Sequence, residues 1–187
     1  MSLVRKYIEG LNDCLEELLQ QNIEEIADII FDAYKKDKQI FIMGNGGSAS
    51  TASHFARDLS IGTAVAGKTR LKANSLTDNI ALITALANDT GYSSIFTEQL
   101  VGRLSEGDVV VGISASGNSP NVLKAIEFAQ KEGAITIGLI GFGGGRLKEL
   151  AHKCIILSSQ DYRTVEDVHL CLAHIICYLT REKIANG

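Results

Sequence analysis

The stretch Gln39-Ile40-Phe41-Ile42-Met43-Gly44-Asn45-Gly46-Gly47-Ser48 decides the fold, because it joins an apolar run to a turn rich in glycine. The apolar residues, 40–43, have the length of a short, fully buried strand. The glycines that follow allow the backbone to turn sharply and to approach a ligand without a β-carbon in the way. A helix that begins directly after such a turn presents unpaired N–H groups, which suit a phosphate. Many strand-to-helix turns are rich in glycine for packing reasons, so this stretch alone leaves anion binding and packing equally open.

The pattern of a buried strand followed by a helix recurs along the chain. Apolar runs predict further strands over 109–113, 134–140 and 154–157, and we expect another strand over 73–76. Apolar residues at helical spacing predict helices over 48–60, 80–87, 95–100, 122–130, 147–150 and 164–184. Strands that alternate with helices indicate an α/β fold, an open parallel sheet with helices on both faces. Because ligands bind beyond the carboxyl ends of such strands, the polar turns after 40–43 and 109–113 should lie at the same edge.

We expect a single domain over residues 1–187, with an N-terminal helical segment over 1–37 and an α/β core over 38–187. Asn22 is expected to separate two helices in the N-terminal segment, because acidic residues follow it as in the first turn of a helix. A long helix ahead of an α/β core packs either on a partner subunit or on its own sheet. We favour packing on a partner, and hence an oligomer. The segment comes before the first strand, so it cannot be a helix that connects one strand of the sheet to the next.

Composition and charge exclude several classes of protein. Of the 187 residues, 45% are apolar and 21% are charged, as in an ordinary soluble globular domain. The net charge of −4 provides no electrostatic footprint for nucleic acid or for an anionic membrane. No apolar run approaches the roughly 20 residues of a membrane span, and we see no signal peptide. The cysteines form no CxxC pair and are expected to be buried free thiols in a reducing cytoplasm; they are Cys14, Cys154, Cys171 and Cys177.

A serine-rich loop, Ser114-Ala115-Ser116-Gly117-Asn118-Ser119, follows the strand expected at 109–113. Its three hydroxyls, together with the N–H groups of the next helix, form a neutral cup for a phosphate. A helix needs only one serine as its N-cap, so two of the three should have no capping role. Neither polar turn contains a lysine or fits a P-loop or a dinucleotide fingerprint. The loop therefore predicts phosphate binding of another kind.

A histidine and a carboxylate lie at helical spacing just after the glycine turn. His54 and Asp58 are four residues apart, hence on one face of a helix. Side chains placed in this way can ligate a divalent metal or share acid–base chemistry. A surface ion pair is the alternative, and the spacing alone favours it.

The C-terminal helix carries a second pair of titratable side chains. Glu166 and His174 are eight residues apart, about two helical turns. Because apolar residues flank His174, a buried structural histidine is the ordinary interpretation of that residue. The other histidines, His152 and His169, are interpreted as structural or solvent-facing.

Taken in order, these motifs resemble those of the sugar isomerase (SIS) domain family. The motifs are Gly44-Asn45-Gly46-Gly47-Ser48, His54-Phe55-Ala56, Asn88-Asp89, the serine loop 114–119, and the helix with Glu166 and His174. The serine loop is typical of SIS domains in general. Its combination with His54 and His174 is similar to the phosphoheptose isomerase branch of the family. The resemblance covers essentially the whole chain.

The resemblance implies a fold, an assembly and a reaction. The fold is a five-stranded parallel sheet in a flavodoxin-like α/β/α sandwich, and the assembly is a homotetramer with active sites between subunits. The reaction is aldose–ketose isomerisation through an enediol, which interconverts sedoheptulose 7-phosphate and D-glycero-D-manno-heptose 7-phosphate, with Zn²⁺ as the cofactor. Two alternatives stay open: a non-catalytic SIS module that senses a phosphosugar or binds a protein such as a replication initiator, and an isomerase of another phosphosugar.

Site residues follow from the resemblance position by position. Those expected to hold the phosphate are Ser114, Ser116, Ser119 and the backbone of Ala115, which stands where the family usually has threonine. Those expected to contact the sugar are Asn45, Gly46, Gly47, Ser48, Asn88, Asp89 and Glu166. Those expected to bind zinc and to shuttle protons are His54, Asp58, Glu166 and His174, with Asp58 and His174 as the acid–base pair.

Two positions depart from the family's pattern. Asp58 stands where the family has its catalytic glutamate, and a side chain shorter by one methylene displaces a base by about 1 Å, which can cost ~100-fold in rate. Asp58 therefore favours the non-catalytic alternative, whereas the retention of His54 and His174 favours an enzyme. Glu166 replaces the usual glutamine and adds a negative charge beside the implied Zn²⁺, a ligand chemistry that zinc accepts.

Overall fold

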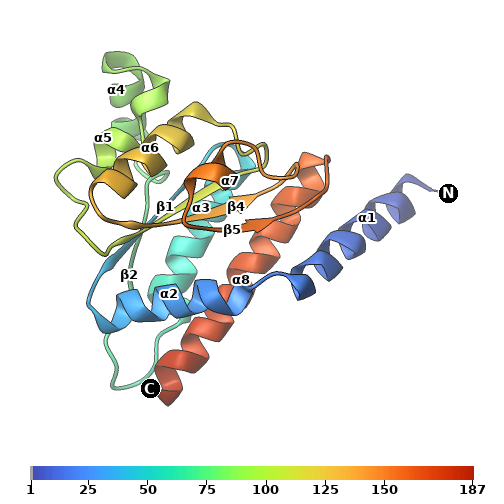
Figure 1. Ribbon diagram of the computed structural model, residues 1–187, viewed down its shortest axis with the longest axis horizontal. Helices are drawn as coiled ribbons and strands as arrows, with labels where there is room; N and C mark the ends of the chain where they lie inside the picture. Colours follow the sequence, from blue (N-terminus) through green and yellow to red (C-terminus); the bar gives the residue numbers. More distant parts are fainter. Residues whose placement is uncertain (1) are drawn as a thin grey trace.

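A computed structural model describes residues 2–187, in which strands and helices alternate around one parallel sheet (Figure 1). The strands are β1 (Gln39–Gly44), β2 (Lys72–Ser75), β3 (Val109–Ser114), β4 (Ile135–Ile140) and β5 (Lys153–Ile156). The helices are α1 (Leu3–Glu17), α2 (Ile23–Lys35), α3 (Gly47–Arg57), α4 (Ile80–Asp89), α5 (Thr97–Leu100), α6 (Pro120–Lys131), α7 (Leu147–Leu150) and α8 (Tyr162–Asn186). Short 3₁₀ turns cover Leu18–Gln20 and Tyr92–Ser94, and a π-helical turn covers Asp58–Gly62.

The sheet contains five parallel strands in the order β2-β1-β3-β4-β5. The chain places β2 on one side of β1 and all later strands on the other side. The strand order therefore reverses between β1 and β3, and open α/β sheets bind ligands beyond the carboxyl ends of the strands at such a switch point. The glycine turn and the serine loop follow these two strands. The predicted α/β fold with an open, five-stranded parallel sheet is confirmed.

Helices cover both faces of the sheet, because alternate residues of each strand point in opposite directions. In β1, Ile40 and Ile42 pack in the core that includes α2, α3 and α8, whereas Phe41 and Met43 pack in the core that includes α5, α6 and α7. The residues of β3 are buried throughout, as a parallel sheet covered on both faces requires. The helices α3 and α8, which carry the predicted acid–base residues, therefore share one face of the sheet.

The N-terminal segment forms two helices, and Asn22 separates them as predicted. The side-chain oxygen of Asn22 caps α2 by accepting a hydrogen bond from the Glu25 N–H (3.3 Å). The helix α2 covers the sheet of its own chain with buried residues that include Ile30. The helix α1 instead extends from the body of the protein as an arm (Figure 1), and the Tyr7 hydroxyl ties it to α8 by donating to Asp167 (2.6 Å).

Two helix boundaries differ from the prediction. The helix expected over 48–60 changes into a π-helical turn at Asp58, whose carbonyl accepts a hydrogen bond from Thr63 N (3.1 Å). The helix expected over 80–87 continues to Asp89 in α4, so Asn88 and Asp89 form the end of this helix. The chain turns only at Gly91, where φ is +89°.

The described cysteines are free thiols, as predicted. Cys14 and Cys177 are buried, but Cys154 and Cys171 are only half-buried, so the expectation that all four are buried is wrong for these two. Burial raises the pKa of the Cys154 thiol above its usual value. Over residues 2–187, no helix combines the length and the apolar character that crossing a membrane requires.

Candidate active site

The serine loop is folded by its own hydroxyl groups. Ser114 Oγ accepts a hydrogen bond from Gly117 N (3.1 Å) and lies 3.2 Å from Ser119 Oγ, while Ser116 Oγ accepts from Asn118 N (3.2 Å). Ser119 occupies the N-cap position of α6, but its hydroxyl makes no capping hydrogen bond. The expectation that one of the serines caps the helix is therefore wrong. The start of α6 is left without a serine cap, which suits an anionic ligand.

A glycine-rich loop after β4 supports the serine loop through backbone contacts. Gly117 has a φ of +63°, and a β-carbon there would overlap the carbonyl of Gly144. A β-carbon at Gly145 would overlap the carbonyl oxygen of Ser116, and Leu147 N donates a hydrogen bond to the carbonyl of Gly117 (2.9 Å). Sequence reasoning missed this support, although the run of glycines was a signal for close backbone approach.

A cavity of about 190 Å³ lies between the serine loop, the turn after β1 and the start of α8. Its lining includes the predicted residues Asn45, Ser48, Ser114, Ala115, Ser116, Ser119 and Glu166. Ile113, Phe142 and Tyr162, which sequence reasoning missed, complete it. Asn88 and Asp89 are exposed at the end of α4 and do not line this cavity, so the structure does not bring them together with the other predicted residues.

The glycine turn directs the start of α3 toward this cavity. Gly46 is the N-cap with a φ of +57°, a left-handed conformation that favours glycine, and Gly47 is the first helical residue. No side chain caps α3, so its first N–H groups and its positive dipole end can attract an anion. The carboxylate of Glu166 lies against Gly47, where a β-carbon would overlap it. Among the described residues that line the cavity none is lysine or arginine, so Glu166 carries its one formal charge.

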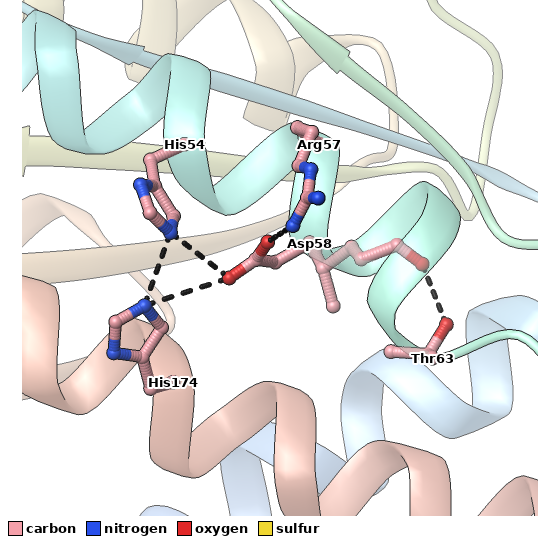
Figure 2. Close-up of polar contacts among 6 residues, drawn as sticks. His54, Arg57, Asp58, Thr63 and His174 are labelled. Atoms are coloured by element: carbon pink, nitrogen blue, oxygen red, sulfur yellow. Dashed lines mark hydrogen bonds and ion pairs between the residues drawn. The ribbon is translucent and has the colours of Figure 1, made fainter.

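Two histidines and one aspartate converge between α3 and α8 (Figure 2). His54 Nε2 lies 3.1 Å from Asp58 Oδ2, and His174 Nε2 lies 3.5 Å from the same oxygen and 3.0 Å from His54 Nε2. The other carboxylate oxygen, Asp58 Oδ1, pairs with Arg57 (2.5 Å). His54 and Asp58 thus form the predicted pair, and His174 on α8 completes a cluster with them.

His174 is not the buried structural histidine that its apolar neighbours indicated. Its side chain is 50% exposed and that of His54 is 44% exposed, whereas the carboxylate of Asp58 is only 12% exposed. Leu172 and Ala173, which directly precede His174, belong to the buried face of α8, whereas His174 does not. Both imidazoles are therefore accessible to a ligand, and Asp58 supports them from the protein side.

A π-helical turn follows directly after the last residue of α3 and begins at Asp58. Thr63 N donates to the carbonyl of Asp58 five residues earlier, and Thr63 Oγ1 donates to the carbonyl of Leu59 (2.6 Å; Figure 2). Such turns insert an extra residue into a helix and occur frequently at functional sites. No sequence pattern that we considered predicts this one.

Two other titratable groups on α8 are buried and take no part in the cluster. His169 is 0% exposed, and neither ring nitrogen has a hydrogen-bond partner among the described residues; burial lowers its pKa to about 4. Burial, reinforced by the charge of Asp58, raises the pKa of Cys177 to about 12. Both groups are therefore neutral at neutral pH. His152 is exposed, and its Nδ1 accepts a hydrogen bond from Thr136 N (3.1 Å), whereas His169 is buried. Both outcomes lie within the expectation that these histidines are structural or solvent-facing.

The helices α3 and α8 run in the same direction from the cavity to the histidine cluster. Gly47 contacts Glu166 near the start of both helices, and His54 contacts His174 further along. Ser48 and His54 are separated by about 9 Å along the axis of α3. Glu166 therefore lines the cavity and lies outside the cluster, which among the described residues consists of His54, Asp58 and His174.

Fold and site together define a parallel α/β protein with a serine-rich loop at its switch point and a histidine–carboxylate cluster further along α3 and α8. The SIS domain family matches residues 6–141 of the chain. The chain belongs to the SIS domain family.

Relatives in this family cover nearly the whole chain. The phosphoheptose isomerase of Akkermansia muciniphila is 36% identical over 186 residues, which are 98% of each chain. The phosphoheptose isomerase of Citrifermentans bemidjiense is 40% identical over 174 residues, which are 92% of this chain and 90% of the relative. Among solved structures, phosphoheptose isomerase GmhA from Neisseria gonorrhoeae is 28% identical, has a TM-score of 0.86, and matches 96% of this chain and 95% of its own.

Proposed function

We propose that the protein is an aldose–ketose isomerase of a phosphorylated sugar, and that it interconverts sedoheptulose 7-phosphate and D-glycero-D-manno-heptose 7-phosphate. The observation that carries this proposal is the position of the His54–Asp58–His174 cluster beside the serine-lined cavity, on the helices α3 and α8. The proposal is supported by relatives named phosphoheptose isomerase that match nearly the full length of the chain. We place the enzyme in the cytoplasm. We also propose that residues 1–187 act as a single domain.

The cavity binds the phosphate in this proposal. The hydroxyls of Ser114, Ser116 and Ser119, the backbone of Ala115 and the start of α6 surround the anion without any formal positive charge. The sugar then extends along α3 toward the histidines, since about 9 Å of helix suits a sugar chain with its phosphate at one end and its carbonyl at the other. Its hydroxyls contact Asn45, Gly46, Gly47, Ser48 and Glu166, whereas Asn88 and Asp89 lie outside the cavity at the end of α4.

The reaction moves two protons and no heavy atoms. From the ketose, a base removes a proton from C1 and an acid protonates the carbonyl oxygen on C2, which gives an enediol. Transfer of the O1 proton to the protein and of a proton to C2 then gives the aldose. We assign these transfers to Asp58 and His174, because Asp58 Oδ2 and His174 Nε2 are 3.5 Å apart and can share protons with a ligand between α3 and α8.

The cluster fits a zinc ion. Ligand atoms at 2.0–2.1 Å from a tetrahedral Zn²⁺ lie about 3.3 Å from one another. The three ligand atoms of His54, Asp58 and His174 lie 3.0–3.5 Å from one another, and three protein ligands leave the fourth position for a substrate. A bound Zn²⁺ would polarise the two substrate oxygens. It would also occupy Asp58 Oδ2 and His174 Nε2, so these two atoms can transfer protons only while the metal is absent. Glu166, which we expected as a further ligand, fits a contact with a sugar hydroxyl better because it lies against Gly47.

We propose that four chains assemble into a homotetramer with active sites between subunits. The arm α1 exposes Leu3 (85%), Val4 (70%) and Ile8 (50%), and α4, which has no buried residue, exposes Ile80 (74%). Apolar surfaces of this kind mark protein–protein contacts. The half-exposed histidines leave room for a second subunit to close the site.

Light scattering should therefore give a mass four times the 20.1 kDa of the chain. The variant Ile8→Asp should shift this mass downward, because a buried unpaired carboxylate at an apolar interface is costly. Glu9→Gln on the same helix is the matched control and should leave the mass unchanged. A wild-type protein that elutes with the mass of one chain would rule out the tetramer.

Proton NMR of sedoheptulose 7-phosphate in D₂O tests the reaction directly. We expect deuterium to appear at C1 together with an aldose product, because solvent exchanges with the acid–base pair while the enediol exists. The measurement is made with and without added Zn²⁺, and a rate that rises with the metal supports the zinc site. Binding of the phosphosugar without any exchange would favour the sensor alternative, and neither binding nor exchange would indicate another sugar or a protein partner.

A further inference from the structure

Two asparagine side chains join the two ligand-binding loops at the switch point. Asn45 follows β1, and Asn121 is the second residue of α6. Asn45 Nδ2 donates to Asn121 Oδ1 (2.9 Å), and Asn121 Nδ2 donates back to Asn45 Oδ1 (2.9 Å). Neither amide can rotate without breaking both hydrogen bonds, so the pair fixes the turn after β1 to the start of α6.

The orientation of this amide pair is set from the α6 side. Asn121 is 1% exposed, and its Oδ1 also accepts a hydrogen bond from Val122 N (3.0 Å). A backbone N–H can only donate, so this contact fixes which atom of the Asn121 amide is the oxygen. The Asn121 nitrogen must then face Asn45, and it can only meet the Asn45 oxygen.

A third group completes the arrangement from the turn after α4. The Tyr92 hydroxyl donates to Asn45 Oδ1 (2.8 Å), so this oxygen receives two hydrogen bonds and both of its lone pairs are used. The one hydrogen-bonding group of the Asn45 side chain that is still free among these contacts is the second N–H of Nδ2. Because Asn45 lines the cavity together with Ser114 and Ser119, this N–H is available to a bound ligand.

We infer that Asn121 is a positioning residue, which acts together with Tyr92 to hold the Asn45 amide as a hydrogen-bond donor to an oxygen of the bound sugar phosphate. The inference rests on the proposed function for the identity of the ligand. Asn121 does not line the cavity, so it acts only through Asn45. The site therefore selects for an acceptor at this point, because the Asn45 oxygen is already saturated.

A purely structural role of Asn121 gives a different kinetic result. Loss of a buried side chain that only stabilises α6 lowers the folded fraction, so kcat per chain falls and KM stays the same. Loss of a positioning side chain releases the Asn45 amide in a protein that is still folded, so KM rises. The two roles are also separable by additivity, because a residue that acts through Asn45 has no further effect once Asn45 is removed.

The test compares Asn45→Ala, Asn121→Ala and the double variant with sedoheptulose 7-phosphate as substrate. We expect Asn121→Ala to raise KM about 10-fold, the size of one lost hydrogen bond to a charged ligand, with kcat within about 3-fold. Asn45→Ala should raise KM at least as much, and the double variant no further. Tyr92→Phe, which frees one lone pair of Asn45 Oδ1, should raise KM less. An unchanged KM in Asn121→Ala, or losses that multiply in the double variant, would overturn the inference.

Gln99→Ala is the matched control for the loss of a buried amide. Gln99 is 5% exposed and donates to the carbonyls of Leu76 (3.0 Å) and Ile95 (2.9 Å). This variant should lower the melting temperature and leave KM unchanged.

A second readout keeps the inference testable if the wild-type protein does not turn over the sugar. Such a result would contradict the proposed function, and NMR of protein labelled with ¹⁵N at asparagine would then decide the positioning role. We expect the Asn45 Nδ2 proton that is bonded to Asn121 to exchange slowly with solvent in the wild type and to lose this protection in Asn121→Ala. Equal exchange in both proteins would overturn the inference whatever the substrate is.

Discussion

Asp58→Asn is expected to lower kcat about 1,000-fold while the protein stays folded. Asparagine has the size of aspartate and keeps an oxygen for Arg57, but its nitrogen replaces one of the two carboxylate oxygens. Within the part of the chain that the structure describes, this carboxylate is the one acidic group in contact with both imidazoles, at 3.1 Å from His54 and 3.5 Å from His174. Its loss removes the proton acceptor that we assign to the enediol step. Steady-state kinetics with sedoheptulose 7-phosphate measures the effect, and circular dichroism checks the fold.

The controls separate this role from a general effect of charge. Asp37→Asn removes a carboxylate that is 79% exposed and pairs with Lys72 far from the cluster, and it should leave kcat unchanged. His174→Ala should reproduce the loss seen in Asp58→Asn, because we assign both groups to one acid–base unit. Zinc content, measured on each variant, shows whether the loss follows from a missing metal. Turnover in Asp58→Asn within about 10-fold of the wild type would remove Asp58 from the mechanism.

The sheet and its ligand edge were predictable because local sequence determines them. The strands are continuous apolar runs, and a parallel sheet that is covered on both faces requires such runs. The run expected over 109–113 is the strand Val109–Ser114, and the serine loop follows it at the switch point. The sequence predicts that the hydroxyls of this loop lie together, but it does not predict which hydrogen bond each hydroxyl makes. The Ser119 hydroxyl meets Ser114 and leaves α6 uncapped, which only the folded loop determines.

The exposure of His174 could not be predicted, because α8 is apolar on more than its buried face. Ile175 is 36% exposed and Tyr178 is 66% exposed, although both have the apolar character of buried residues. A helical period assigns a buried face only when the opposite face is polar. The apolar neighbours of His174 therefore indicated the wrong surroundings. An assembly that covers this side of α8 is a physical reason for such a sequence.

The contacts that organise the cavity join residues far apart in the chain. Asn45 and Asn121 are separated by 76 positions, and Gly117 meets Gly144 across two neighbouring strands. No local pattern specifies such pairs, since each asparagine or glycine alone fits an ordinary turn. Residue types at strand ends thus predict that a ligand site exists, whereas the orientation of its groups depends on tertiary contacts.

Acidification is expected to destabilise the protein through His169. This imidazole is fully buried without a hydrogen-bond partner among the described residues, and its pKa of about 4 lies well below the 6.5 of an exposed histidine. Between these two values the unfolded chain binds a proton that the folded chain does not. Stability is therefore highest above pH 6.5 and falls as the pH drops toward 4, by about 3 kcal/mol for this residue.

Urea unfolding at pH 7.5, 6, 5 and 4 measures this loss, at one fixed protein concentration because assembly also contributes to stability. Carboxylates contribute to the acid loss as well, and the wild type is therefore compared with His169→Leu, which keeps the apolar volume and has no proton to bind. The free energy of unfolding of His169→Leu should fall by about 3 kcal/mol less than that of the wild type over the same range. His152→Leu removes an exposed imidazole that is hydrogen-bonded to Thr136, so its pH profile, and not its absolute stability, controls for the loss of a histidine as such. Parallel pH profiles of the wild type and His169→Leu would show that His169 is protonated in the folded protein, and they would contradict its burial as a neutral ring.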